Sequence, residues 1–72
     1  MEIVRPKSTR IEEVQYFAVD SAMTVEFKRG GTYRYTPIDE ELWDNLRNAE
    51  SMGKAFNELV KGNQDISFER VA

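Results

Sequence analysis

The side chains best suited to chemistry in this chain are cations. They fall in three places: an N-terminal arm, a glycine turn at the centre of the chain, and the start of a helical pattern. Lysine and arginine side chains contact phosphate groups, which supply much of the affinity of proteins for nucleic acids. The sequence therefore predicts a phosphate-contacting surface made of Arg5, Lys7, Arg10, Lys28, Arg29, Arg34 and Lys54.

Catalysis is not expected, because the chain contains no histidine and no cysteine. A Ser–His or Cys–His nucleophile pair cannot form, and a zinc site would need carboxylates alone. Glu40 and Asp44 lie one helical turn apart, where a solvated helix face is the simpler interpretation. We also expect a chain of this length to be too short to enclose a pocket of the size usual for active sites. The prediction is a non-enzymatic protein without metal or cofactor.

The net charge of −3 argues against a generic nucleic-acid-binding protein, which is usually basic. A second hypothesis is a protein-interaction module, such as a phage-encoded inhibitor or adaptor. Its partner would contact the acidic first helix, which follows Ile38, or an apolar sheet patch of Phe17 and Val19. Convergence of the basic residues on one face would favour RNA, whereas a contiguous Phe17/Val19 patch would favour a protein partner or a homodimer.

The compartment and assembly follow from composition. No apolar run approaches the roughly 20 residues of a membrane span, and residues 1–10 lack the apolar centre of a secretory signal. The absence of cysteine is compatible with the cytoplasm. We expect a cytoplasmic protein without membrane contact, as a monomer or a weak homodimer.

A β-hairpin with a glycine turn is the centre of the predicted fold. Residues 23–28 and 32–36 alternate apolar and polar side chains with the period of a half-buried strand. A three-residue loop over 29–31 pairs Phe27 with Tyr33 and Val25 with Tyr35, and Gly31 accommodates a positive φ. This pairing places both tyrosines in the core, which we favour over a role as stacking platforms for RNA bases.

The segment before the hairpin supplies the first predicted strand, residues 12–20. A turn at Asp20–Ser21 pairs Tyr16 with Val25. The pairing directs Val14, Tyr16 and Ala18 to the core and leaves Phe17 and Val19 on the open face of the sheet. Residues 1–10 form an extended arm, of which residues 1–6 are loose.

Two helices follow the third strand, which Pro37 ends. Asp39 is the N-cap of the first helix, and Ser51 is the N-cap of the second, with Gly62 at its C-terminal end. The apolar stripes of these helices are Leu42, Trp43, Leu46 and Ala49, then Met52, Ala55, Phe56, Leu59 and Val60. We predict one α+β domain over residues 1–72: a three-stranded antiparallel meander followed by two helices packed on one face (β-β-β-α-α). The alternation of Ile66 and Phe68 with polar neighbours is compatible with a short C-terminal edge strand, but the sequence does not decide whether it forms.

An ordered set of short motifs runs through the chain: residues 8–11 (STRI), 24–27 (TVEF), 33–35 (YRY) and 49–57 (AESMGKAFN). The set resembles the KTSC domain, a short bacterial and phage module also found at the C-terminus of some lysyl-tRNA synthetases. The resemblance covers residues 7–71 and implies a β-β-β-α-α module, with RNA binding suggested by the synthetase fusion. Phe17 and residues 36–39 depart from the family pattern. The family-motif residues are Tyr33, Tyr35, Ser51, Gly53, Phe56 and Asn57.

Part of this motif has two interpretations. In the structural one, Ser51 caps its helix and Gly53 permits a close approach of neighbouring backbone. In the functional one, the helix start beside Lys54 receives a phosphate or a carboxylate. Asn57 is expected either to hydrogen-bond the loop near Pro37 or to face a ligand.

Overall fold

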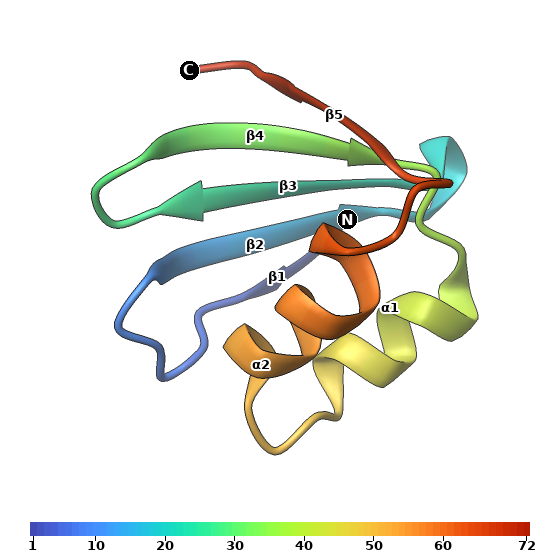
Figure 1. Ribbon diagram of the computed structural model, residues 1–72. Coiled ribbons are helices and arrows are strands. Elements are labelled where there is room, and N and C mark those ends of the chain that lie inside the picture. Colours follow the sequence, from blue (N-terminus) through green and yellow to red (C-terminus); the bar gives the residue numbers. More distant parts are fainter.

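The computed structural model describes all 72 residues as a five-stranded antiparallel sheet with two helices on one face (Figure 1). The strands lie side by side in chain order: Glu2–Val4 (β1), Ile11–Phe17 (β2), Ala22–Phe27 (β3), Gly31–Thr36 (β4) and Ser67–Arg70 (β5). The helices are Glu40–Arg47 (α1) and Met52–Phe56 (α2), the latter continuing into the π-helical turn Asn57–Lys61 (η2). The predicted α+β class is confirmed, but the sheet has five strands and not three.

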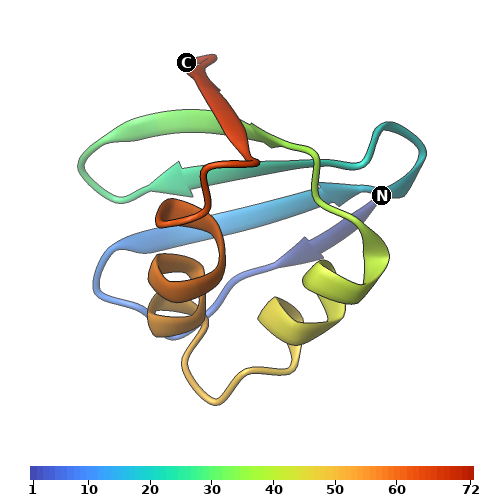
Figure 2. The same cartoon turned by 45° about the vertical axis from the view of Figure 1, so that its right-hand side comes forward.

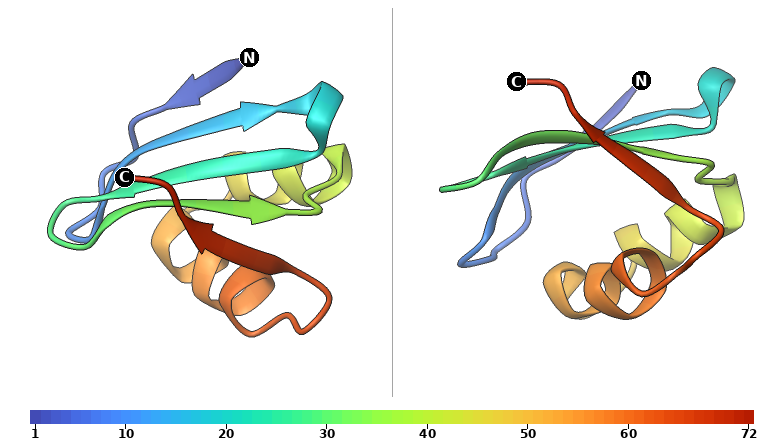
Figure 3. Two further views of the ribbon diagram at one scale, coloured as in Figure 1. Left: turned by 90° about the horizontal axis from the view of Figure 1, so that it is seen from above. Right: turned by 45° about the horizontal axis from the view of Figure 1, so that its top comes forward.

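Both ends of the chain form edges of the sheet, one on each side (Figure 3). The prediction of a loose arm over residues 1–6 is wrong, because Glu2 pairs with Tyr16 and Val4 with Val14. At the opposite edge, the C-terminal strand that the sequence did not decide is present, with Phe68 opposite Tyr35. Three-residue β1 carries no readable alternation, and it forms because its backbone satisfies the free edge of β2.

The β3–β4 hairpin has the predicted loop length and a left-handed glycine, but its register differs by two residues. The loop is Lys28–Gly30, so that Val25 pairs with Tyr33, and the Lys28 N–H donates to the Arg10 carbonyl of the β2 side at 2.8 Å. Gly31 has φ 84°, and a Cβ there would lie 2.8 Å from Arg70 Nη2. An even shift preserves the face of every side chain, so the predicted core face is confirmed.

The predicted two-residue turn before β3 is wrong. β2 ends at Phe17, and a 3₁₀ turn, Ala18–Asp20 (η1), followed by Ser21 at φ 48° makes the connection. The longer link pairs Tyr16 with Met23 where the sequence predicted Val25, again a shift of two that keeps the faces.

The apolar patch predicted for the open face is not formed by the sheet. Val19 lies on η1 and is 99% exposed, whereas Phe17 stays on β2 and is half-buried. Ala18, predicted in the core, is exposed on η1 as well. Because β2 ends at Phe17, Ala18 and Val19 belong to the turn and not to the sheet.

The core fills the space between the sheet and the two helices, which lie on the same side (Figure 2). The Tyr16 ring stacks on Trp43 with centroids 4.9 Å apart, and its hydroxyl donates to the Ile38 carbonyl at 2.8 Å. The predicted apolar stripes face this core, except Leu59, which is 36% exposed. Leu59 turns outward because the chain widens into the π-helical turn after Phe56.

The helix boundaries follow the predicted signals. β4 ends at Thr36, and Asp39 accepts a hydrogen bond from the Leu42 N–H at 2.8 Å. Ser51 likewise accepts from the Lys54 N–H at 3.3 Å. Gly62 occupies the predicted C-cap, although its φ of −91° does not require glycine. Neither helix has the length and apolarity to cross a membrane.

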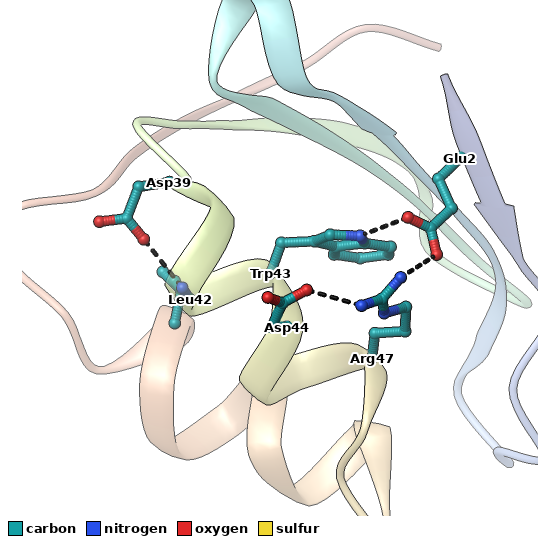
Figure 4. A network of polar contacts seen from close by, with 6 residues as sticks. All are labelled: Glu2, Asp39, Leu42, Trp43, Asp44 and Arg47. Atoms are coloured by element: carbon teal, nitrogen blue, oxygen red, sulfur yellow. Dashed lines mark hydrogen bonds and ion pairs between the residues drawn. The ribbon is translucent and has the colours of Figure 1, made fainter.

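A polar network joins β1 to α1 across 41 residues of sequence (Figure 4). The Trp43 Nε1–H donates to the Glu2 carboxylate at 2.9 Å, and the Arg47 guanidinium donates to it at 3.0 Å. Arg47 also pairs with Asp44 at 2.7 Å. These hydrogen bonds lower the pKa of Glu2 from its ordinary value of 4.5, and the bond from Trp43 has a larger effect than the bond from Arg47.

The lowered pKa of Glu2 predicts a pH-dependent contribution to stability. Because the folded pKa lies below the unfolded one, this contribution is complete above pH 4.5 and is lost as the pH falls through the folded pKa. The wild type should be more stable than Glu2→Gln at pH 7, and the difference should shrink on acidification. Urea unfolding at several pH values, followed by fluorescence of Trp43, the only tryptophan, measures the difference. A difference that does not change with pH would contradict the linkage.

Candidate functional site

The loop between β1 and β2 faces the second helix across a hollow of about 470 Å³. We call this hollow the basic pocket. Its base is formed by Ile11, Phe27 and Phe56, which join it to the core. Its polar lining consists of Lys7, Ser8, Thr9 and Arg10 on the loop and Ser51, Gly53, Lys54, Asn57 and Lys61 on α2 and η2.

Ser8 gives the loop side of the basic pocket its shape. Its Oγ accepts from the N–H groups of Arg10 and Ile11, each at 3.1 Å, which sets Arg10 at the start of β2. Across the pocket, a Cβ on Gly53 would lie 3.5 Å from the same Oγ. That is ordinary van der Waals contact, so the predicted close approach exists, but an alanine would fit there.

A smaller hollow of about 260 Å³ extends the basic pocket to the tip of the β3–β4 hairpin. It shares Thr9, Arg10 and Phe27 with the basic pocket and adds Lys28 and Arg29. Five of the seven predicted phosphate-contacting residues therefore converge at one end of the sheet: Lys7, Arg10, Lys28, Arg29 and Lys54.

The other two predicted residues lie elsewhere. Arg5 forms an ion pair with Glu13 at 2.9 Å. Arg34 pairs with Thr24 and Glu69 on neighbouring strands, on the face of the sheet away from the helices. The sequence places Arg5 only two residues from Lys7, and it is the tertiary fold that separates them.

Lys61 was missed by the sequence reasoning although it lines the basic pocket. Lys54, Asn57 and Lys61 are spaced i, i+3 and i+7, which places them on one face of a helix. That polar spacing was the available signal. Asn57 itself lines the pocket and forms no side-chain hydrogen bond, so the predicted bond to the loop near Pro37 is absent.

The charged side chains at this end of the sheet are all positive. Its six cations form no ion pair, and no aspartate or glutamate lines either hollow. Carboxylates gather instead at the opposite end of β4, where Asp39, Glu41 and Asp65 line another hollow. No acidic cluster is placed to hold a metal ion. Despite the net charge of −3, the basic end is suited to bind an anion.

A second large hollow of about 530 Å³ adjoins the basic pocket and shares Phe27, Phe56 and Lys61 with it. We call it the aromatic groove. Besides the two shared phenylalanines it is lined by Tyr33, Tyr35 and Phe68, and ring centroids of neighbouring side chains lie 5.2–6.0 Å apart.

The two motif tyrosines differ in burial. Tyr35 is buried, as predicted. Desolvation by burial raises the pKa of its hydroxyl, and the charge interaction with Tyr33 adds a smaller effect in the same direction. Tyr33 is half-buried and forms a wall of the aromatic groove. Both large hollows fall within the ~300–1,000 Å³ of typical ligand sites. Both are open clefts bordered by loop, helix and edge strand, so the expectation that the chain is too short to enclose a pocket of this size is not contradicted.

Comparison with known proteins finds related sequences and a matching family model. A family model of the KTSC domain matches residues 7–63. A lysine–tRNA ligase of Nostoc punctiforme is 29% identical over 70 residues, which are 97% of this chain but 12% of the ligase. A protein of Tsukamurella paurometabola is 34% identical over 55 residues, covering 76% of this chain and 82% of that protein.

The fold is also found in a crystal structure. A KTSC domain protein of Yersinia pestis is 26% identical and superposes with a TM-score of 0.83, covering 99% of this chain and 100% of that chain. The match therefore includes the edge strands β1 and β5, which lie outside the segment that the family model matches.

Proposed function

The chain belongs to the KTSC domain family, and from that premise we propose that it is a non-enzymatic module whose basic pocket binds the backbone of RNA. The observation that carries the proposal is the convergence of six unpaired cations at one end of the sheet. RNA is favoured over other polyanions because relatives of this chain form part of lysine–tRNA ligases.

The lining of the basic pocket suits a sugar–phosphate chain. Lysine and arginine neutralise phosphates, and hydroxyl and amide groups such as those of Thr9, Ser51 and Asn57 supply hydrogen bonds to phosphate and ribose oxygens. The pocket and its extension to the hairpin tip form a continuous basic surface, which fits more than one phosphate. Binding of this kind positions the backbone without reading the sequence.

The test is an NMR titration of isotope-labelled protein with bulk tRNA at low and at roughly physiological salt. Amide shifts should cluster around Arg10, Lys54 and Lys61, and affinity should fall steeply with salt, by about 0.7–0.9 log unit per log unit for each phosphate contacted. Spectra unchanged at both salts would refute RNA binding.

Charge reversals separate the basic pocket from general electrostatics. Lys54→Glu should weaken binding at least tenfold and reduce the salt slope, because a phosphate contact becomes a repulsion. Arg34→Glu makes the same change in net charge on the opposite face. It should leave the affinity within about twofold, since Arg34 lines neither basic hollow and salt screens its effect on a backbone bound there. Equal losses in both variants would contradict the assignment to the basic pocket.

A protein partner is the second candidate, and one observation favours it. The acidic hollow at the other end of the sheet includes Leu42 and Ile66 beside its carboxylates and contains no cation. Such a surface fits a basic segment of another protein. In this case Glu41→Lys would weaken capture of that partner, whereas Lys54→Glu would not.

A further inference from the structure

We infer that the aromatic groove receives one unpaired base of a single-stranded RNA whose backbone lies in the basic pocket. The inference rests on the proposed function and adds to it the form of RNA that is preferred. It is carried by the continuity of the two hollows, which share Phe27, Phe56 and Lys61. A phosphate held by Lys54 and Lys61 therefore lies beside the entrance to the groove.

Part of the aromatic surface of the groove is exposed to solvent and lies outside the core. Phe68 is 67% exposed on the edge strand β5. Its neighbour Tyr35 is buried, and so is Phe56, which packs against Tyr35. Tyr33 is half-buried with its ring 6.0 Å from Phe68. Exposed rings over a rigid wall are the usual means by which proteins stack unpaired bases, and every base presents a suitable face.

The polar rim of the groove also fits a base. Lys61 is its only charged residue, so no carboxylate opposes an adjoining phosphate. Asn63 is engaged in its own turn, where its Oδ1 accepts from the Asp65 N–H at 2.9 Å. The Gln64 amide forms no hydrogen bond within the protein, and it can both donate to and accept from the edge of a base.

A paired base cannot enter the groove without leaving its duplex, which costs a few kcal/mol in unpairing and unstacking. A single strand avoids this cost. The site therefore predicts a preference for single-stranded over double-stranded RNA, while the basic pocket alone would bind both.

The experiment measures fluorescence anisotropy with one labelled 12-nucleotide RNA of mixed sequence, alone and annealed to its complement. The wild type should bind the single strand at least about tenfold more tightly, as expected for one stacked base. Phe68→Ala should abolish this preference and leave the affinity for the duplex unchanged. Phe17→Ala, a half-buried aromatic on the open face of the sheet, is the control and should behave as the wild type.

Each outcome decides between the two proposals. Equal affinity of the wild type for both RNAs, or an equal loss for both in Phe68→Ala, would overturn the base site and leave backbone binding intact. Binding of neither RNA would overturn both proposals. Thermal melting of each variant by circular dichroism, unchanged for Phe68→Ala, ensures that an altered preference is not a loss of fold.

Discussion

Replacing Trp43 by alanine is expected to remove a large part of the stability of this domain. Trp43 is 2% exposed, its ring stacks on Tyr16, and its N–H donates to Glu2. Truncating a buried tryptophan costs about 3–5 kcal/mol, whereas a domain of this size has about 4–11 kcal/mol in total. Urea unfolding followed by far-ultraviolet circular dichroism measures the loss, because the variant has no tryptophan fluorescence.

Trp43→Phe is the matched control. It keeps an aromatic ring over Tyr16 but removes part of the volume and the hydrogen bond to Glu2. We expect a loss of about 1–2 kcal/mol, since Glu2 remains accessible to water. Losses of equal size in the two variants would show that the hydrogen bond dominates and that the packing of the ring does not.

Two phenylalanines of the aromatic groove should differ widely in their effect on stability. Phe56 is 5% exposed and packs edge to face against Tyr35 and Phe27. Phe56→Ala should cost about 3–5 kcal/mol, because it removes a buried ring and leaves a cavity. Phe68→Ala should cost about 1 kcal/mol or less, because the exposed ring buries little surface on folding. Urea unfolding followed by Trp43 fluorescence compares the two.

The comparison also separates structure from ligand contact. Phe56 borders both the basic pocket and the aromatic groove, so its loss disturbs the shape of both. Phe68 borders the groove but not the basic pocket, so its variant tests the base site in a folded protein. Similar stability losses for the two variants would mean that β5 is essential to the core, contrary to the exposure of its side chains.

The local pattern of the sequence predicted the elements well and their pairing less well. Alternation in β3 and β4 assigns Val25 and Tyr35 to one face, and both are buried. The same pattern cannot distinguish registers that differ by two residues, because the faces have a period of two. The turn before β3 was predicted at Asp20–Ser21 but too short, because Ser21 is not a glycine and yet adopts a left-handed conformation.

The candidate site shows the same division. The sequence by itself determined the α+β class, the helix caps, the core faces and most of the cations that line the basic pocket. The tertiary structure alone decided that Arg10 faces Lys54 while Arg5 pairs with Glu13 and Arg34 lies on the other face. It alone built β1 and the aromatic groove. The basic pocket, the aromatic groove and the bond between Glu2 and Trp43 bring together residues more than 30 positions apart. Packing of the helices on the sheet sets such contacts, which no local period encodes.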